Sequence, residues 1–573
     1  MRNKMKKKNI FLLTIVFLLN MICITSCNED ELLKEVPKDF NAPENSYITN
    51  NQFQMAVNNL YFDMRNLMWD ISSDSKYAFY YATDFAFCGA SYLPGSFGKL
   101  NDYTNVMIPS DAVVNLPKWT WLYTMVKDAN VIISRLENPD SKVTEANKKI
   151  FKGEALFFRA FAYRILAHLW GGVPLVLKEV TTPLRDLTRA TRDEVYKQCA
   201  ADLEYGVANL PNIDAVKDGK VSSQVCNHLL SEIYISLKDY DKAIAAATAV
   251  INYPGLALMT VRFGSKKTLP GDVYSDLFRY NNQNRSSGNK EALYVIQYDY
   301  LNAGSALSAD LNRFFIPYYQ TASVGGKSLF AGVSDGKGGR GIGWAIPTRF
   351  FFYQNWEPDF SKDMRNSQYN IIRDVQIDNP ASPYFGKWMV KDGVNKVAGV
   401  DTVRAWYPII TKVARINDSP SDIYQKKTDG SPIKTAFGDI LLTNNASNTF
   451  KDEYLFRLAE TYLLRAEAYI GKSNPTSAAA DINVIRSRAN ATPISASQAT
   501  LDYVLEERLR ELYCEELRMV TLCRLGKLVE RNRKYNPYTG KTISDHHNLW
   551  PIPYTEIARN IFGKIEQNPG YTN

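Results

Sequence analysis

Residues 222–251 read SSQVCNHLLSEIYISLKDYDKAIAAATAVI and carry the strongest evidence for the fold. In the first half, apolar residues recur at four-residue steps, the spacing of one helix face: Val225, Leu229, Ile233 and Leu237. The second half is rich in alanine and closes at Pro254-Gly255, which is typical of a helix end. The stretch therefore predicts two helices, over 222–237 and 241–251, joined by a short turn.

A second helix pair is predicted over 452–489. Its first helix ends at Gly471 and carries an apolar stripe made of Leu455, Leu458, Tyr462, Leu463 and Ala466. Asn474-Pro475 then matches a helix N-cap followed by proline at the first helical position. Two helices with a short turn fit the roughly 34-residue unit of tetratricopeptide repeats. We expect a mainly α fold with a tetratricopeptide-repeat-like helical scaffold and a loop-rich irregular module.

The remaining chain alternates between helical and irregular sequence. Helical periodicity begins near Asn51 and covers 119–136 and 147–170, the last stopped by Gly171-Gly172. Residues 70–117 are rich in Ser, Gly, Asn and Tyr, and 260–450 in Gly, Asn, Asp, Tyr and Trp, with no sustained helical period. We predict a helical N-terminal part, 51–259, with a loop insertion. A C-terminal part, 260–573, would be loop-rich over 260–450 and helical over 451–573.

The N-terminal segment has the composition of an export signal. A basic head is followed by an apolar run of about 15 residues, which is shorter than the roughly 20 that span a membrane. Ile24-Thr25-Ser26-Cys27 places a small residue before a cysteine, as in the lipobox of bacterial lipoproteins. We expect residues 1–26 to be a signal peptide, Cys27 to be lipidated, and 27–50 to be a tether. An ordinary secretion signal with an incidental cysteine is the alternative.

Charge and cysteine content argue against nucleic-acid binding, a disulfide framework and a zinc site. The 573-residue chain has a formal net charge of +8, and removing residues 1–26 takes away five basic and no acidic side chains, which leaves +3. That balance argues against nucleic acid as a partner. Five cysteines remain beyond Cys27, without CxxC spacing, so neither a disulfide framework nor a zinc set is indicated: Cys88, Cys199, Cys226, Cys514 and Cys523. We expect them reduced and mostly buried.

Several blocks together resemble the SusD/RagB family of outer-membrane nutrient-binding lipoproteins. They are WLYTMVKDANVIISR (121–135), GEALFFRAFAY (153–163), WGGVPL (170–175), RLAETYLLRAEA (457–468), INVIRSRA (482–489), EERLRELYCEELRMVTLCR (506–524), LWPIPYTE (549–556) and QNPGY (567–571). They occur in the family's order and span nearly the whole chain beyond the signal. The resemblance implies a SusD-like fold and a lipid-anchored, surface-facing protein of the outer membrane. It also implies capture of oligosaccharide or polysaccharide and a SusC-like TonB-dependent transporter as partner.

Charged residues within these blocks are interpreted as structural. Glu154 and Arg159 lie on one predicted helix, where an exposed pair contributes only ~0.3–0.5 kcal/mol. If either is buried, removing one partner costs about 3–5 kcal/mol. We therefore predict that Arg159→Ala impairs folding rather than binding.

Aromatic and polar residues in the irregular stretches are the candidate ligand contacts. A sugar ring rests its C–H face on an aromatic plane, while its hydroxyl groups need hydrogen-bonding partners. The candidates are Asp84, Tyr92, Asn101, Tyr103, Tyr298, Tyr300, Tyr318, Tyr319, Trp344 and Trp356. The alternative for each is that its side chain packs the loops down.

No catalytic motif is recognised, so we expect neither an enzyme nor a cofactor. Gly336–Gly341 satisfies GxGxxG, but Gly343 and Pro347 follow, so no helix would start there. His546-His547 lacks a third ligand nearby, and we expect no metal site. His168 and His228 fall in helical stretches and are interpreted as core or surface residues.

A lid of the same architecture that binds peptides or glycopeptides is the first alternative function, and a surface glycosidase the second.

Overall fold

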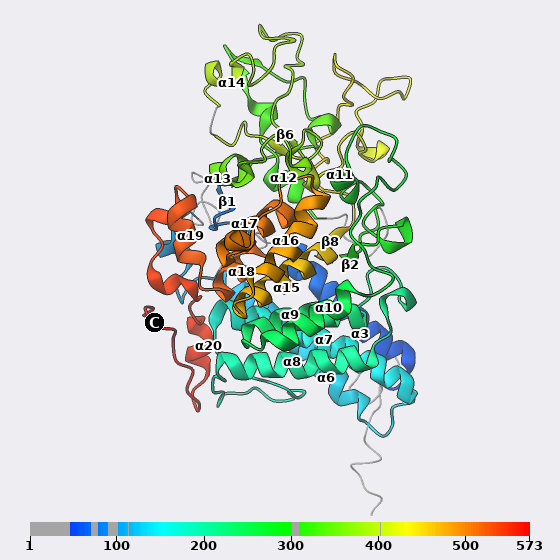
Figure 1. Ribbon diagram of the computed structural model, residues 1–573, viewed down its shortest axis with the longest axis vertical. Coiled ribbons are helices and arrows are strands. Elements are labelled where there is room, and N and C mark those ends of the chain that lie inside the picture. Colours follow the sequence, from blue (N-terminus) through cyan, green and yellow to red (C-terminus); the bar gives the residue numbers. More distant parts are fainter. Residues whose placement is uncertain are drawn as a thin grey trace, which may run out of the picture.

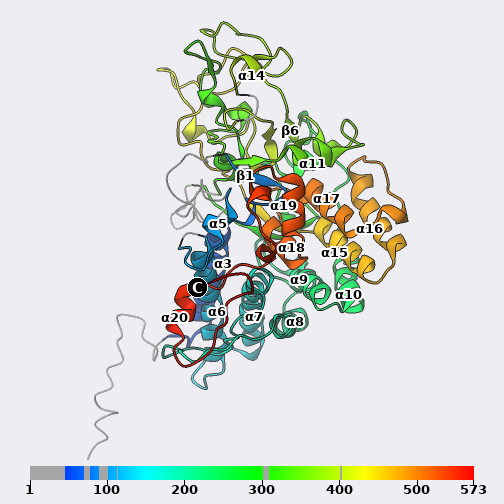
Figure 2. The same cartoon turned by 90° about the vertical axis from the view of Figure 1, so that its left-hand side faces the viewer.

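The computed structural model describes residues 46–69, 78–89, 101–112, 114–300, 309–400 and 403–572. Helices built from the two ends of the chain form one body, and the loop-rich residues of the middle of the chain lie at one end of it (Figure 1). A view turned by 90° shows the same division, with α15 and α16 projecting to one side of the helical body (Figure 2). We call the described residues between 260 and 452 the loop module.

The body holds the long helices of the described residues and several shorter ones. They are α3 (Asn50–Trp69), α6 (Asn115–Leu136), α7 (Glu145–Trp170), α8 (Arg192–Asn209), α9 (Ser223–Ser236), α10 (Tyr240–Ile251), α15 (Leu458–Gly471), α16 (Pro475–Arg488), α17 (Leu501–Leu512), α18 (Arg518–Arg524), α19 (Leu528–Tyr535) and α20 (Tyr554–Arg559), with the short α5 at Tyr103–Val106. This confirms the mainly α prediction.

The loop module holds only short elements. Its helices are α11 (Val273–Leu277), α12 (Leu311–Phe315), α13 (Arg349–Phe352) and α14 (Val394–Val397). Four antiparallel strand pairs occur among the described residues: β1 (Ala86–Cys88) with β5 (Ala345–Pro347), β2 (Ala292–Ile296) with β8 (Glu453–Arg457), β3 (Ser323–Val324) with β4 (Lys327–Ser328), and β6 (Ile371–Ile372) with β7 (Ile409–Ile410). Two of these pairs, β1–β5 and β2–β8, connect the loop module to the rest of the chain.

Consecutive helices pack side by side, as repeat-type pairs do. Helix α7 lies between α6 and α8, α9 packs on α10, and α15 on α16, while α10 and α15 join the two predicted pairs. Almost every side chain of α7 from Phe151 onward is buried. The helix ends at Gly171, whose φ of 76° is readily adopted only by glycine. Asn474 caps α16 and Pro475 is at its start, as predicted.

The structure differs from the sequence analysis in three places. Residues 453–457, including Leu455, form strand β8 rather than the start of a helix, because all five side chains are buried and the strand pairs with β2. Helix α8 was not predicted, although Thr191 and Glu194 form a capping box at its start. The block 506–524, which lies in the part predicted to be helical, is divided between α17 and α18, and Cys514 between these two helices has a φ of 62°.

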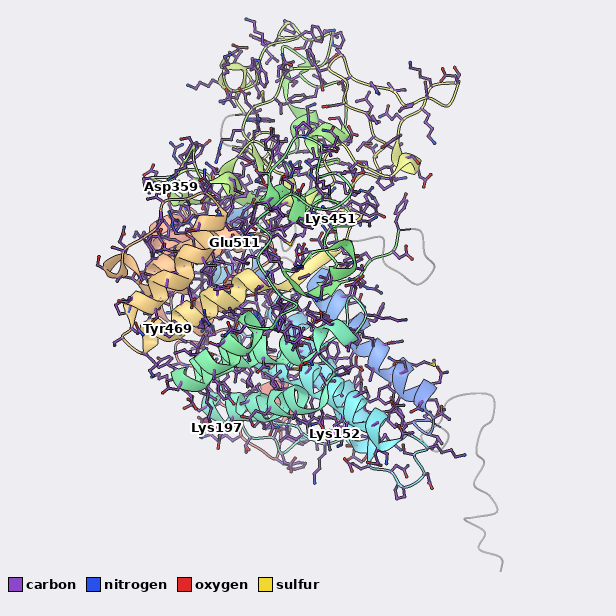
Figure 3. All side chains as sticks on the ribbon, turned by 45° about the vertical axis from the view of Figure 1, so that its right-hand side comes forward. Lys152, Lys197, Asp359, Lys451, Tyr469 and Glu511 are labelled. Atoms are coloured by element: carbon purple, nitrogen blue, oxygen red, sulfur yellow. The ribbon has the colours of Figure 1, made fainter. Side chains whose placement is uncertain are left out.

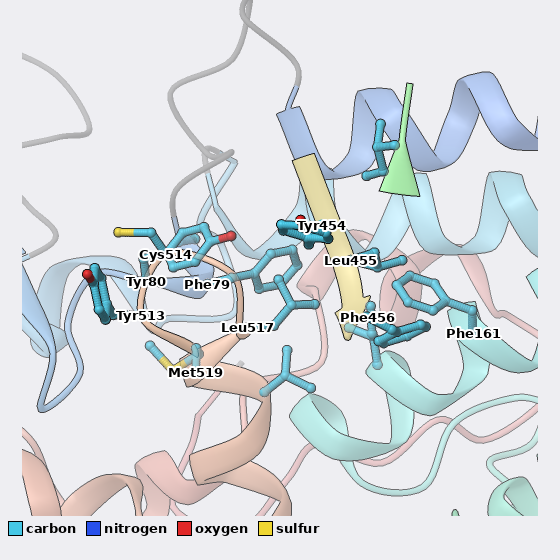
Figure 4. Close-up of a cluster of buried hydrophobic side chains, with 14 of the residues drawn as sticks. Phe79, Tyr80, Phe161, Tyr454, Leu455, Phe456, Tyr513, Cys514, Leu517 and Met519 are labelled. Carbon is cyan, nitrogen blue, oxygen red and sulfur yellow. The ribbon is translucent and has the colours of Figure 1, made fainter. Parts of the chain in front are cut away.

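The main hydrophobic core runs from the helices into the base of the loop module. Tyr454, Leu455 and Phe456 of β8 lie between Phe161 of α7 and Met519 of α18 (Figure 4). The five cysteines predicted to be reduced are all buried thiols, and none of them forms a disulfide within the described residues. Within the described residues, no helix combines the length and apolar character needed to cross a bilayer.

Candidate functional site: a ring-lined cleft in the loop module

The loop module contains an open cleft with a volume of about 1220 Å³. Its walls come from three stretches of the chain: 266–280 with α11, 360–374 with β6, and 411–418 after β7. The pairing of β6 with β7 brings the second and third stretches together, since Ile371 lies opposite Ile410 and Ile372 opposite Ile409. The volume is somewhat above the roughly 300–1,000 Å³ of ordinary ligand pockets in proteins.

Aromatic rings line this cleft and are open to solvent. Phe360, Tyr369 and Trp388 are 38%, 36% and 37% exposed, and all three line the cleft. Tyr280 also lines it, with the guanidinium carbon of Arg415 3.6 Å from its ring centroid. Exposed ring faces beside polar groups can hold a sugar ring, whose C–H face contacts the ring while its hydroxyl groups bond the rim.

Buried ion pairs fix the wall that carries Phe360. Arg365 is fully buried and donates to Asp363, Glu507 and Glu511, with nitrogen–oxygen distances between 2.6 and 3.1 Å. Burial alone would lower the pKa of Arg365, but these carboxylates outweigh it and raise the pKa well above its usual value. Since Glu507 and Glu511 belong to α17, the cleft wall is tied directly to the helical body.

A second contact holds the same wall from the other side. Asp359 pairs with Arg486 of α16 at 2.5 Å and accepts hydrogen bonds from Thr492. Asp359 and Glu511 both lie in the region where the helices meet the loop module (Figure 3). The loop that bears Phe360 is therefore anchored at both of its flanks, which suits a preformed binding surface.

The wall after β7 is anchored through Lys412. Its ammonium group donates to Tyr274 of α11, to the carbonyl oxygen of Glu511 and to the Glu515 carboxylate. Burial lowers the pKa of Lys412 to about 8 despite the nearby Glu515 carboxylate. This contact joins α11, the third wall and the end of α17 at the base of the cleft.

Four of the residues predicted to contact ligand are closed off from solvent, and we do not carry them forward as ligand contacts. Asp84 is fully buried and pairs with Arg518 and Arg531. Tyr103 donates to the carbonyl oxygen of Ala82, and Tyr319 to that of Gly339. The Trp356 ring packs beside Phe351 with 1% exposure. In each case the side chain holds the fold together.

The other predicted residues remain partly accessible where they are described. Asn101 uses its side-chain amide to bond the backbone of Cys88, so it positions strand β1. Tyr318 and Trp344 are half-buried, and each ring faces an arginine, Arg404 and Arg313 respectively. The structure brings these two aromatic segments together, because Gly343 bonds to Ile316.

Tyr298 and Tyr300 follow strand β2 and are also half-buried. The guanidinium carbon of Arg65 lies 5.9 Å from the ring centroid of Tyr298, and the ring of Tyr300 packs edge-on against Phe450. Tyr92 and Cys27 lie outside the described residues. None of these contacts distinguishes a ligand surface from loop packing.

The cleft rings were missed by the sequence analysis. Phe360, Tyr369 and Trp388 lie far apart in an irregular stretch, and nothing in their spacing shows that they share one cavity. The available signal was the concentration of aromatic residues with Asn and Asp between 353 and 388. The pairing of β6 with β7, which closes the cleft, rests on strands of two residues each.

His168, His228 and the charged residue Arg159 have structural partners. His168 bonds Tyr196 and Glu232, and His228 bonds Thr461. Arg159 is buried, as the folding prediction required, but its partner is Asp202 rather than a residue of its own helix. In the part of the chain that the structure describes, no three His, Cys, Asp or Glu side chains are grouped to hold a metal ion.

Comparison with known sequences identifies the family at both ends of the chain. The model of the SusD family matches residues 361–571, and a model described as "Starch-binding associating with outer membrane" matches 39–235. A SusD-like protein of Formosa agariphila is 24% identical over 608 residues, which covers 99% of this chain and all of that protein.

Solved structures show the same fold. A laminarin-binding SusD-like protein superposes with a TM-score of 0.64 at 20% identity, covering 92% of this chain and 100% of that one. A surface glycan-binding protein A of Bacteroides thetaiotaomicron, determined with laminarihexaose, gives a TM-score of 0.62 at 20% identity and covers 91% and 99% of the two chains. Through the family-model matches at 39–235 and 361–571, the chain belongs to the SusD/RagB family.

Proposed function

We propose that this protein captures oligosaccharides at the outer surface of the outer membrane and passes them to a SusC-like TonB-dependent transporter. The observation that carries the proposal is the cleft of about 1220 Å³, in which three aromatic rings are each more than a third exposed. Rings held open to water by a rigid scaffold suit sugar faces, which bind through C–H contacts and need polar groups around them.

Relatives support the ligand class. Proteins of the same fold include one named for laminarin binding and one determined with laminarihexaose. We propose the cleft as the principal sugar-binding surface, and Tyr318 and Trp344, with Asn101 supporting strand β1, as a second surface. Tyr92, Tyr298 and Tyr300 stay in the proposal as further ligand contacts.

The proposed membrane anchor rests on the N-terminal sequence, and the proposed transfer of the glycan to a transporter rests on the family. Lipidation at Cys27 would hold the protein on the membrane, and residues 27–50 are the predicted tether. The partner transporter is proposed by analogy with the family. Ligand would favour a closed lid only if it binds that state more tightly than the open one.

The test is retention without turnover. The full chain in detergent is run through native gels cast with individual polysaccharides, and the same mixtures are analysed for released product by chromatography. Retarded migration with intact glycan is expected. Retardation by peptides alone, or release of shortened glycan, would replace this proposal with the peptide lid or the glycosidase. Co-purification of a TonB-dependent transporter from outer membranes tests the partner.

A further inference from the structure

The carboxylates that line the cleft are occupied by internal donors. Asp272 accepts from Ser367 and Asn370, and Asp363 pairs with Arg365. Asp374 accepts from the backbone of Val375, Val390 and Lys391, and Asp418 pairs with Lys266. Each of these four carboxylates therefore already accepts a hydrogen bond from, or forms an ion pair with, another group of the protein.

Two cationic side chains that line the cleft form no ion pair with the described residues. Within the described residues, neither Lys362 nor Arg373 has a carboxylate oxygen within 4.0 Å, although both line the cleft. Lys362 is exposed and its ammonium group donates to the Thr492 hydroxyl at 3.2 Å. Positive charge is thus left without an ionic partner on the same wall that carries Phe360.

Arg373 has the more unusual environment. One of its terminal nitrogens donates to the carbonyl oxygen of Phe352 and to the side chain of Asn366. Its Nε and its other terminal nitrogen are buried and have no hydrogen-bond partner among the described residues. Burial lowers the pKa of Arg373 to about 10, and no carboxylate offsets that effect. Leaving a cation desolvated without an anion is costly, so an added negative charge nearby would be favoured.

Exposed rings place this cation close to the cleft. The guanidinium carbon of Arg373 is 4.8 Å from the ring centroid of Phe360 and 5.4 Å from that of Tyr353. These two rings are parallel and are 38% and 39% exposed. A ligand lying on Phe360 would therefore come close to both Arg373 and Lys362.

We infer that the cleft binds an acidic oligosaccharide, one whose sugar units carry carboxylate or sulfate groups. This inference rests on the proposed function and names its ligand class. The sugar faces would rest on Phe360, Tyr369 and Trp388, while the anionic substituents would be drawn to Lys362 and Arg373. Lys362 supplies a direct contact at the surface, and Arg373 adds attraction from behind the ring of Phe360.

The experiment compares acidic oligosaccharides with matched neutral ones. Full-length protein in detergent is titrated by calorimetry with a panel of uronate-containing and sulfated oligosaccharides, each paired with its carboxyl-reduced or desulfated form. At least one acidic member is expected to bind about tenfold or more tightly than its neutral partner, since hydrogen bonds to charged groups are the stronger ones. The preference should shrink as salt is raised from 50 to 500 mM, as Debye screening requires.

Variants with matched controls assign the effect to the cleft. Lys362→Gln and Arg373→Met are expected to remove most of the preference for the acidic form, and Tyr369→Ala to weaken both forms. Because Lys362 is exposed, Lys362→Gln should keep the wild-type melting temperature, which separates lost binding from lost folding. Lys197→Gln on α8 and Tyr554→Ala on α20 are the exposed controls and should bind as wild type.

The outcomes separate this inference from the proposed function. Equal affinity for every acidic and neutral pair, or wild-type binding by all three cleft variants, would overturn the acidic cleft while leaving sugar capture in place. Absence of binding to any oligosaccharide would overturn both. Loss of preference in Lys362→Gln and Arg373→Met, with both controls unchanged, supports the inference.

Discussion

The replacement Asp84→Asn tests whether this buried residue is structural or belongs to a ligand site. The Asp84 carboxylate accepts from Arg518 at 2.7 and 2.8 Å and from Arg531 at 2.5 Å, with no side-chain exposure. Burial opposes its ionisation, but the two guanidinium groups outweigh this and hold its pKa below the usual range. Replacing it with asparagine leaves two buried cations with one neutral acceptor.

The size of the loss follows from the partners that remain. Arg518 keeps a contact with Glu516 at 3.1 Å. Among the described carboxylates, Arg531 keeps only Asp502 at 3.6 Å, a residue that is half exposed. Breaking a buried pair by removing one partner costs about 3–5 kcal/mol. With an m value of ~3 kcal/mol per molar urea, the midpoint of unfolding should fall by about 1–2 M.

The assay is urea unfolding followed by tryptophan fluorescence, with oligosaccharide affinity measured on the folded protein. Asp102→Asn at the start of α5 is a control, since Asp102 is not fully buried and bonds only Thr104 and Asn105. A midpoint equal to wild type, combined with lost affinity, would refute the structural role and return Asp84 to the ligand site.

Further predictions concern folding and pH. Arg159→Ala should cost about 3–5 kcal/mol in urea unfolding, because Arg159 is buried and bidentate to Asp202 at 2.7 and 2.8 Å. Gly172→Ala should lower the melting temperature, since an added Cβ would lie 2.3 Å from the carbonyl oxygen of Ala190. Burial and the charge of Asp128 raise the pKa of Asp63 to about 7, so the folded state keeps a proton that the unfolded chain loses above about pH 4. Asp63→Asn should therefore raise the melting temperature at pH 8 and change little at pH 4.

Controls make these outcomes specific. Lys148→Ala removes an i,i+3 pair with the exposed Glu145 and should cost under about 0.5 kcal/mol. An Arg159→Ala protein no less stable than Lys148→Ala contradicts the buried pair. Wild-type melting of Gly172→Ala would show that the two backbone segments are not held at this distance. A change in melting temperature of Asp63→Asn that is equal at pH 4 and pH 8 contradicts the raised pKa of Asp63.

Local sequence patterns were enough for most of the helical scaffold, with α8 the exception. Four-residue apolar steps, the glycine stop at Gly171 and the Asn474-Pro475 cap are each set by a few neighbouring residues. Strand β8 was not predicted, because a short run of buried apolar residues has the same pattern in a helix and in a buried strand. Its pairing with the distant β2 is what makes it a strand.

The site was less predictable because it depends on contacts between distant residues. Aromatic content correctly drew attention to the loops, yet burial divides those rings into structural and accessible ones. Tyr319 lies inside the module while Tyr369 faces the cleft, and no local pattern distinguishes the two. Arg365, which anchors the cleft wall, reaches Glu511 over 146 positions of sequence.

A crystal structure of the full chain with its tightest-binding oligosaccharide tests the central claim most directly. The account predicts an intact glycan in the cleft, with sugar faces on the rings of Tyr369 and Trp388. A glycan bound to the helical body away from the loop module, or found cleaved, would contradict it.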